Sequence, residues 1–392
     1  MELLYISAYQ FKTQVDGIYA LPAYGNQFWA KYLDVFDSVR VLGVQVKDYL
    51  DNGKMVKITD SRVKVEIIPS NIHPKDFKND CKIKRKLESE ISKSDAILIK
   101  PTSRKGIMAI KIAKKYAKKY ILEFTGDLKL TLNTNQSILK RLYSPILHRQ
   151  ILSAIKDASY GIYVTEKYLQ RVYPIKGKSC GITDSVIDYI DENVIDKRIN
   201  KILSKSDGEV IRIGLIGSYH DYRKGIDTAI QALSKLNHLN IELHILAMGI
   251  EQDRTKWFDF ARRVHFEKSL FFDAPRVTTQ KVFEWIDDID ISILPSRSEG
   301  LPRCIVESIS RACPCITSNV CGMPELINNK WIHNPNNVDE LMNLVSSMIS
   351  DKQLMISAAK ENFLRSHNFL KDNLSKRRNK FLLDFKESCS MR

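Results

Sequence analysis

The sequence lacks long apolar runs and a regular cysteine pattern. None of its apolar runs reaches the ~20 residues that a membrane-spanning helix needs. Its seven cysteines are an odd number without the spacing of a disulfide scaffold, which favours a reducing compartment. Residues 1–7 are typical of a strand and lack the basic region and cleavage site of a secretory signal. We therefore expect a cytoplasmic protein without disulfides.

Recognisable nucleic-acid and zinc-binding patterns are also missing. The sequence has no zinc-finger spacing and no RNP-like aromatic strand, so nucleic acid is not an expected partner. Cys313, Cys315 and Cys321 lie close together, but no second pair of ligands accompanies them. They are expected at a helix end and in a core strand, and no metal is expected there.

Positive charge is in excess, with a formal net charge of +15. Lysines are concentrated in residues 78–93, 105–119 and 371–380. The apolar side of residues 105–119 indicates an amphipathic helix that packs on a sheet and exposes its lysines to solvent. The same lysines also fit attachment to an anionic membrane surface, where each nearby cation contributes ~1 kcal/mol. The sequence leaves both interpretations open.

The length of 392 residues is too great for one core and fits two α/β domains. Strands and helices alternate through the first half, as in a doubly wound sheet. A polar segment at residues 196–209 marks the expected boundary. This gives domains at 1–200 and 201–365 and a C-terminal helix at about 366–392, which packs back on the first domain.

The most informative segment is residues 295–307, Pro-Ser-Arg-Ser-Glu-Gly-Leu-Pro-Arg-Cys-Ile-Val-Glu. It follows a short β-branched run typical of a buried strand and leads into an expected helix at 303–312. Glu299 would lie beyond the strand's carboxyl end, where ligands of open α/β sheets bind, and Glu307 one turn into the helix. Free N–H groups at the helix start favour an anion, and Arg303 there also requires one. The alternative is an ordinary turn followed by a solvated helix glutamate.

A second polar loop, residues 217–225, has the sequence Gly-Ser-Tyr-His-Asp-Tyr-Arg-Lys-Gly. It lies between an expected strand at 211–216 and an expected helix at 226–236. Its glycines allow the backbone to approach a ligand closely, and Arg223 and Lys224 add two cations. The loop has neither the dinucleotide fingerprint nor the P-loop spacing.

Together, the two segments resemble the nucleotide-sugar half of GT-B glycosyltransferases, most closely the retaining family 4 enzymes. Glu299 and Glu307 match the family's Glu-x7-Glu pair. The family's glycine- and lysine-bearing loop is matched by Gly217, Lys224 and Gly225. The resemblance implies a GT-B fold, in which two Rossmann-like, doubly wound domains face a central cleft.

The resemblance also implies a role for each donor-side residue. Glu307 would bind the ribose, Lys224 the leaving diphosphate, and Glu299 the donor-sugar hydroxyls, with Lys224 and Glu299 as the catalytic pair. The backbone turn that faces the sugar would be Gly300, Leu301 and Pro302.

One donor-side position departs from the family pattern. The arginine that usually follows the loop glycine is Ser218 here. Arg223 or Arg303 would have to supply the missing cation.

Four residues of the first half are expected on the acceptor side. Gly25 and Asn26 precede a helix where relatives have a glycine-rich loop, although Asn26 also fits an ordinary helix cap. Asp127 remains from a His-Asp pair of which Gly126 replaces the histidine. Glu166 follows a strand and fits either acceptor binding or a helix start.

The resemblance implies retaining sugar transfer from a nucleotide-sugar donor to a glycan or polyprenyl-linked acceptor in bacterial surface polysaccharide synthesis. Asp288 and Asp290 have the Asp-x-Asp spacing of the metal-binding GT-A enzymes but precede their strand, so neither a metal nor another cofactor is expected. A GT-B phosphorylase or epimerase, or a catalytically silent relative that binds sugar or membrane, remains open.

Overall fold

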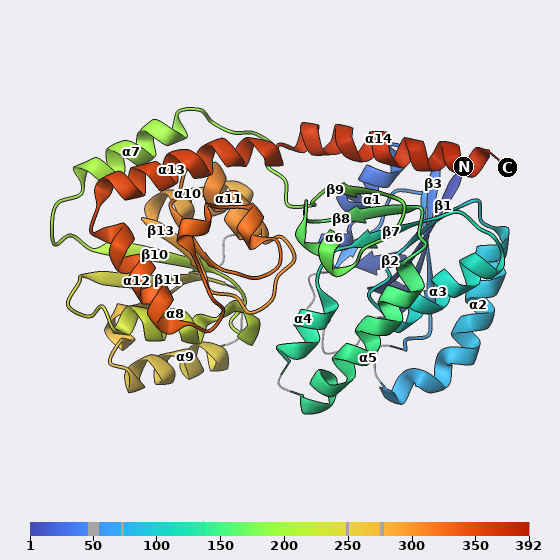
Figure 1. Cartoon of the computed structure of the whole chain (residues 1–392), viewed down its shortest axis with the longest axis horizontal. Coiled ribbons are helices and arrows are strands. Elements are labelled where there is room, and N and C mark those ends of the chain that lie inside the picture. Colours follow the sequence, from blue (N-terminus) through green and yellow to red (C-terminus); the bar gives the residue numbers. More distant parts are fainter. Residues whose placement is uncertain (46–54, 72–73, 136, 248–250, 275–277, 392) are drawn as a thin grey trace. The chain divides into compact units, whose positions relative to one another are not determined.

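The computed structural model describes residues 1–391 except 46–54, 72–73, 136, 248–250 and 275–277. The chain forms two units, each built around one sheet (Figure 1). Unit 1 consists of Met1–Ile182 and Ser375–Arg392, and unit 2 of Thr183–Leu374.

The division between the units lies earlier than the sequence analysis placed it. Helix α7 (Val194–Ser204) belongs to unit 2. Its buried Arg198 donates hydrogen bonds to the carbonyls of Ile289 (2.6 Å) and Ile286 (2.8 Å). Because these contacts fix α7 on unit 2, the polar segment expected to mark the domain boundary is instead partly helical and packed.

The sheet of unit 1 is mainly parallel. Its parallel strands have the order β5-β3-β1-β6-β7-β8-β9, and β2 and β4 add antiparallel pairs beside the end of β1. The strands are β1 (Glu2–Gln14), β2 (Gly17–Ala20), β3 (Ser38–Gln45), β4 (Val56–Lys57), β5 (Val63–Ile68), β6 (Ala96–Ile99), β7 (Tyr120–Phe124), β8 (Tyr160–Tyr163) and β9 (Lys178–Gly181). The helices are η1 (Pro22–Tyr24), α1 (Asn26–Leu33), η3 (Pro74–Asn79), α2 (Asp80–Lys93), α3 (Arg104–Lys115), α4 (Leu128–Asn133), α5 (Ile138–Ile155), α6 (Tyr168–Val172) and α14 (Lys371–Ser390) from Ser375 onward.

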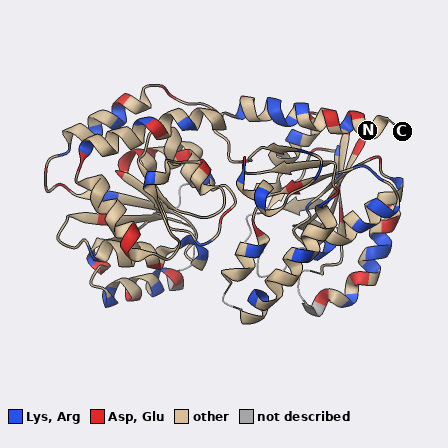
Figure 2. Ribbon diagram, in the orientation of Figure 1, with Lys and Arg blue, Asp and Glu red and all other residues tan. Residues whose placement is uncertain are grey.

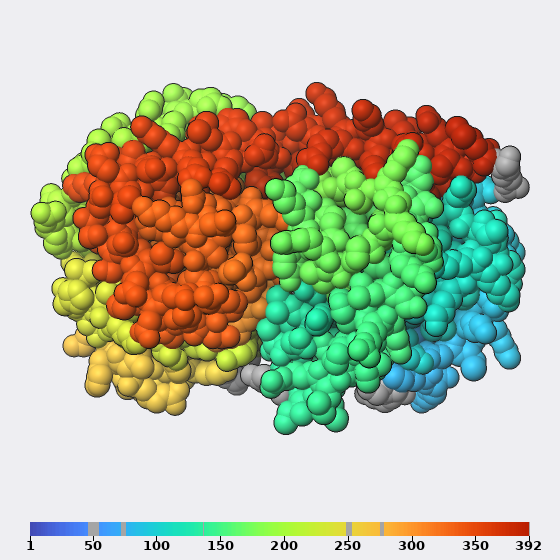
Figure 3. All heavy atoms as spheres, viewed as in Figure 1, coloured from blue at the N-terminus to red at the C-terminus, as the bar shows by residue number. Residues whose placement is uncertain are grey.

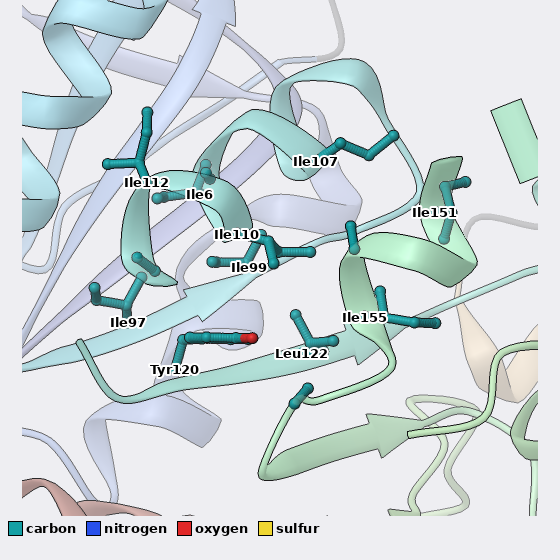
Figure 4. Packing of buried hydrophobic residues seen from close by; sticks show 14 of the residues in the cluster. Ile6, Ile97, Ile99, Ile107, Ile110, Ile112, Tyr120, Leu122, Ile151 and Ile155 are labelled. Carbon is teal, nitrogen blue, oxygen red and sulfur yellow. The ribbon is translucent and has the colours of Figure 1, made fainter. Parts of the chain in front are cut away.

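Two helical layers cover this sheet, because successive strand residues point to opposite faces. Leu4 and Ile6 of β1 belong to the cluster that α2, α3 and α5 complete. Leu3 and Tyr5 belong to the opposite cluster, which α1 and α14 complete. Figure 4 shows the first layer, in which isoleucines of α3 and α5 pack against β6 and β7. Burial on both faces explains why these strands are nearly continuous apolar runs.

Unit 2 has a fully parallel sheet of order β12-β11-β10-β13-β14-β15. This is the strand order of a Rossmann fold, and the order reverses between β10 and β13. Its strands are β10 (Ile211–Ile216), β11 (Ile241–Leu246), β12 (Leu270–Asp273), β13 (Ile291–Leu294), β14 (Cys315–Ser318) and β15 (Ile332–His333). Besides α7, its helices are η4 (Tyr222–Lys224), α8 (Ile226–Ser234), α9 (Glu251–Arg263), η5 (Glu267–Ser269), α10 (Thr279–Asp288), α11 (Arg303–Ser310), η6 (Met323–Glu325), η7 (Asn329–Trp331), α12 (Val338–Ile349), α13 (Lys352–Ser366) and η8 (His367–Phe369).

The first strand differs most from its sequence-based expectation. It was expected to end at Ser7, but β1 continues to Gln14 and folds back onto β2. Its pairing with β3 shifts register between Ile6 and Gln10, which breaks the apolar pattern that the expectation used. Val15 and Asp16 make the turn between the two strands, and Gly17, at φ +145°, begins β2.

Lys105 is a buried charge near the start of α3. It is 2% exposed, and its ammonium has no hydrogen-bond partner within the part of the chain that the structure describes. Burial lowers the pKa of Lys105 to about 7. Between that pH and the ordinary lysine pKa of ~10.4, the unfolded chain binds a proton that the folded chain does not, so stability rises with pH across this window.

Lys105→Met is therefore expected to raise the free energy of unfolding by roughly 2–4 kcal/mol near pH 6.5, because methionine needs no solvation. The gain should shrink towards pH 10, where the wild-type lysine is neutral when folded. Urea unfolding at both pH values, with the exposed Lys111→Met as control, measures it. A loss of stability, or an equal gain at both pH values, would contradict this assignment.

Candidate active site

The two loops singled out by sequence lie next to each other in unit 2. One follows β10 and the other follows β13, and these neighbouring parallel strands flank the point where the strand order reverses. Ligands of open α/β sheets bind at this point. The backbone N–H of Arg297 donates to the carbonyl of Arg223 at 2.7 Å, which joins the loops directly.

Gly225 allows the loops to approach this closely. It has φ +70°, a left-handed conformation that side chains disfavour. A Cβ atom there would lie 2.1 Å from the carbonyl oxygen of Pro295, at the start of the other loop. Only glycine tolerates both the left-handed conformation and this close approach. The structure therefore explains why the loop ends in the glycine that the family pattern also has.

Arg297 also holds the two loops together, a role that sequence reasoning missed. It is 6% exposed and forms two hydrogen bonds with the Asp227 carboxylate, at 2.9 and 2.7 Å. It further donates to the Tyr222 carbonyl (2.7 Å) and to the side chain of Asn336 (2.5 Å). The only sequence signal is an aspartate at the start of the helix after the first loop, which does not reveal its partner.

Lys224 and Glu299 form an ion pair between the loops. The Lys224 ammonium donates to Glu299 Oε1 at 2.7 Å, and the Ser296 hydroxyl donates to the same oxygen at 2.8 Å. The side chains of Lys224 and Glu299 are 20% and 12% exposed. Burial disfavours the lysine charge, but the Glu299 carboxylate outweighs it, so the pKa of Lys224 is raised and the ammonium stays charged.

The start of α11 leaves its first N–H groups without a side-chain cap. Pro302 is the N-cap residue and forms no capping hydrogen bond. Uncapped N–H groups and the helix dipole together favour an anion. Gly300, Leu301 and Pro302 make the turn between Glu299 and this helix start.

Glu307 lies in α11 and is mostly buried. Its Oε1 accepts from Arg303 Nε at 3.0 Å, and Oε2 has no hydrogen-bond partner among the described residues. Burial raises the pKa of Glu307, and Arg303 opposes this only in part. Glu307 lines a recess of about 620 Å³ with Arg303 and with Thr279, Gln280 and Phe283 of α10. The idle solvated glutamate of the alternative interpretation does not fit this burial.

The remaining donor-side residues surround this pair of loops. Arg223 is bound to Asp221 by hydrogen bonds of 2.8 and 2.7 Å, so its charge is already paired. Gly217 lies against the Lys224 side chain, which a Cβ atom would approach to 2.9 Å. Ser218 is partly buried and adds no charge. Lys224, Arg223 and Arg303 thus each have a carboxylate partner.

The acceptor-side candidates are held in structural contacts of unit 1. Gly25, not Asn26, is the N-cap residue of α1. The Asn26 side chain instead bridges to the loop after β4, donating to the Thr59 hydroxyl (2.7 Å) and accepting from the Thr59 N–H (3.0 Å). The capping alternative for Asn26 is therefore wrong, because Asn26 is already the first helical residue.

Asp127 and Glu166 have partners within the same unit. Asp127 caps α4 through Leu130 N–H (3.1 Å) and accepts from the hydroxyls of Tyr168 (2.9 Å) and Tyr173 (3.0 Å). Glu166 forms an exposed ion pair of 2.9 Å with Arg377. Acceptor binding by these residues stays a prediction.

Sequence reasoning missed a buried charged group at the carboxyl end of β7. Glu123 accepts from the hydroxyls of Tyr5 (2.6 Å) and Tyr32 (2.7 Å), and Lys100 lies 3.4 Å away. Burial alone would raise the pKa of Glu123, but Lys100 and the other neighbours outweigh it and lower the pKa to about 2. A lone glutamate in an apolar strand was the available signal.

Comparison with known proteins identifies the family. Residues 211–351 match the family described as "Glycosyl transferases group 1". Protein CapJ of Staphylococcus aureus is 31% identical over 99% of this chain and 96% of its own length. The chain belongs to the group 1 glycosyltransferases. The matched residues include both loops of the site, and the family expected from them is confirmed.

The fold of this glycosyltransferase is GT-B, as expected. The structure of a sucrose-phosphate synthase from Thermosynechococcus elongatus aligns with a TM-score of 0.69 at 12% identity, covering 99% of this chain and 100% of that one. A glycosyltransferase from Rickettsia africae aligns with a TM-score of 0.63 at 18% identity, covering 100% and 99%. At such low identity these structures establish the fold alone.

Asp290 and the cysteines are among the remaining residues that the sequence offered as possible metal ligands. Asp290 is 4% exposed, pairs with Lys201 and Lys205, and accepts from the Arg212 N–H at 2.8 Å. All seven cysteines are free. Within the described ranges, no three His, Cys, Asp or Glu side chains are grouped as metal ligands.

Proposed function

We propose that this glycosyltransferase moves a sugar from a nucleotide-sugar donor to a lipid-linked glycan, with retention of anomeric configuration, in bacterial surface polysaccharide synthesis. The observation that carries the proposal is the Lys224–Glu299 ion pair, which lies beside the uncapped start of α11 where the strand order reverses. A cation and free N–H groups fit a diphosphate, and a carboxylate beside them fits sugar hydroxyls.

The charge balance of the site suggests how the donor is accommodated. Lys224, Arg223 and Arg303 are each paired with a carboxylate, so the three pairs carry no net charge. A diphosphate would take Lys224 from Glu299 and bind the N–H groups of α11. Glu299 would then keep its hydrogen bond from Ser296 and gain the sugar hydroxyls as new donors.

Glu307 would hold the nucleoside. Its free Oε2 can accept from vicinal ribose hydroxyls, and Arg303 already orients Oε1. The recess that Glu307 lines offers Phe283 as an apolar surface and Thr279 and Gln280 as polar groups for a base. A nucleoside diphosphate thus has a complementary group for its ribose, its phosphates and its base.

The configuration would be retained because the acceptor attacks from the same face that the diphosphate leaves. Lys224 neutralises the charge that develops as the bond between the anomeric carbon and the diphosphate breaks. The acceptor oxygen bonds to that carbon on the same face, and its proton goes to a phosphate oxygen. Glu299 stabilises the positive sugar without forming a covalent bond to it.

Relatives support the substrate class and the pathway. The O-antigen biosynthesis glycosyltransferase WclY of Escherichia coli is 34% identical over 104 residues, 26% of this chain and 28% of its own. An Escherichia coli UDP-Gal:alpha-D-GlcNAc-diphosphoundecaprenol alpha-1,3-galactosyltransferase is 34% identical over 82 residues, 18% of this chain and 21% of its own. These partial matches favour a diphospholipid-linked glycan as the acceptor.

The reaction itself is tested with a panel of nucleotide sugars, with and without undecaprenyl-diphosphate glycans as acceptors. We expect slow release of free nucleoside diphosphate from one donor, and faster release when an acceptor is present. Release that requires inorganic phosphate would indicate a phosphorylase instead. No turnover of any donor, with binding retained, would indicate a silent relative.

Transfer is expected to survive excess EDTA. Lys224 and the free N–H groups at the start of α11 would supply the positive charge that the diphosphate needs, and Asp290 is already paired with two lysines. Initial rates with EDTA, with added Mg²⁺ and with added Mn²⁺ measure this. Complete loss in EDTA with recovery on adding either ion would overturn the metal-free account.

A further inference from the structure

The first half of α5 exposes an apolar face in unit 1. Ile138, Leu139, Leu142 and Ile146 are 68%, 79%, 67% and 53% exposed. Spacings of three and four residues place Leu139, Leu142 and Ile146 on one side of the helix. Figure 4 shows that Ile151 and Ile155, further along α5, point towards the sheet instead. The exposed group therefore does not serve the core of unit 1, and Figure 3 shows α5 at the surface.

Only positive charge accompanies this face in the sequence. Residues 128–156 contain no aspartate or glutamate, whereas their basic residues are Lys129, Lys140, Arg141, Arg149 and Lys156. Helix α3, which packs on α5, adds Lys111, Lys114 and Lys115, and α2 beyond it carries further basic residues together with Asp80, Glu88 and Glu90 (Figure 2). An exposed apolar face on a helix that carries cations and no anions of its own fits a negatively charged surface that has an apolar interior.

A cationic groove between α3 and α5 continues the apolar face. Its volume is about 320 Å³, and its charged lining residues are Lys111, Lys114 and Arg149. Lys114 donates to the Ala154 carbonyl at 2.9 Å and lies 3.6 Å from Asp157. Lys111 and Arg149 have no ion-pair partner in the part of the chain that the structure describes. The groove therefore offers two uncompensated cations to a phosphate-bearing headgroup.

We propose that the apolar face of α5 and the α3–α5 groove dock this protein on an anionic lipid bilayer. Leu139, Leu142 and Ile146 enter the boundary between headgroups and acyl chains, and Lys111 and Arg149 bind lipid phosphates. This rests on the proposed function in one respect, since a lipid-linked acceptor would be presented at such a surface. Protein interfaces are depleted in lysine, which favours a bilayer over a protein partner for a face bordered by lysines.

In this proposal the bilayer is bound by α5 and the groove. It therefore differs from the interpretation left open by the sequence, in which the lysines of residues 105–119 attach the protein. The described residues contain no helix long and apolar enough to cross a bilayer. Attachment would thus depend on a few inserted side chains together with cations, and both parts should be needed.

Sedimentation of the full chain with vesicles tests the proposal without any nucleotide sugar. We expect binding to 70:30 phosphatidylcholine:phosphatidylglycerol vesicles and little binding to pure phosphatidylcholine. A variant with Leu139→Gln, Leu142→Gln and Ile146→Gln should bind at least tenfold more weakly, with an unchanged thermal midpoint. Lys111→Gln with Arg149→Gln should also weaken binding and reduce its salt dependence.

Matched controls separate docking from general stickiness and charge. Leu203 and Leu364 are 50% and 71% exposed on unit 2, so Leu203→Gln with Leu364→Gln should bind vesicles as wild type does. Lys118→Gln with Lys119→Gln should have a smaller effect than the groove variant. Wild-type vesicle binding by the triple glutamine variant would overturn the proposal, as would a greater loss from the Lys118 and Lys119 changes.

Two further measurements identify other causes. Sedimentation equilibrium without vesicles should show the same mass for wild type and the triple variant; a dimer that only the wild type forms would make a second copy the occupant and overturn the proposal. Calorimetry with UDP, GDP and ADP should give the same result for both proteins. Absent nucleotide binding in both would count against the proposed function and leave the vesicle result to decide docking.

Discussion

Lys224→Ala is expected to lower the rate of sugar transfer by roughly 10²–10³-fold, the effect of removing one group that stabilises developing charge. Lys224 is the cation nearest to Glu299, and burial makes its charge strong in the site. Arg223 and Arg303 are exposed and have carboxylate partners of their own, so they replace it poorly. Steady-state rates with the donor and its acceptor measure the loss.

Lys235→Ala is the matched control for Lys224→Ala. Lys235 follows α8, the helix that Lys224 precedes, and pairs at the surface with Asp339. It should leave the rate unchanged. If Lys224→Ala kept more than a third of the wild-type rate, the diphosphate would not depend on Lys224. If Arg303→Ala lost as much as Lys224→Ala, Arg303 would be the missing cation at Ser218.

Glu307→Ala and Glu299→Ala are expected to fail in different ways. Glu307 would hold the ribose, so its loss should weaken binding of free nucleoside diphosphate by about tenfold or more, as expected for a lost charged hydrogen bond of ~1.5–3 kcal/mol. Glu299 would face the sugar, so its loss should leave free nucleotide affinity nearly intact and reduce transfer by orders of magnitude. Removing Glu299 also frees Lys224, which can even tighten diphosphate binding.

Calorimetry of both variants with a nucleoside diphosphate, together with transfer rates, measures this difference. Glu325→Ala, a partly buried glutamate of η6, serves as a control for generic loss of carboxylate. Equal nucleotide affinity in both variants would show that Glu307 does not bind the ribose. Transfer at the wild-type rate in Glu299→Ala would show that Glu299 does not act on the donor sugar.

The parts of the site that sequence predicted are those set by short local patterns. β10 and the start of α8 follow the expected bounds, and α11 starts at Arg303 as expected. Such segments have clear periodicity, and glycine and proline mark their ends. Gly225 was recognised in the sequence as a glycine that ends a polar loop. The structure supplies the reason for it, because its conformation and its contact with Pro295 both require glycine.

The parts that sequence did not predict depend on partners far along the chain. Arg297 finds Asp227 and Asn336, and Asp127 finds Tyr168 and Tyr173, through contacts that no local pattern encodes. The unit boundary was misplaced for the same reason, because the polar sequence of α7 hides the burial of Arg198. Polar residues that bind buried carbonyls look like linker residues until their partners are known.

The exposed face of α5 shows another limit of sequence patterns. The isoleucines and leucines of α5 are typical of a core helix. Only the structure shows that Leu139 and Leu142 lie outside the core. Periodicity identifies an apolar stripe but does not say what covers it.

In the proposed function, the loops after β10 and β13 bind the diphosphate of a nucleotide sugar. Calorimetric titration of UDP, GDP and ADP into the wild type and into Lys224→Ala tests it most directly. We expect one of these nucleotides to bind the wild type with a stoichiometry of one, and Lys224→Ala to weaken that binding at least tenfold. Equal affinity in both proteins, or no binding of any nucleotide to the wild type, would contradict it.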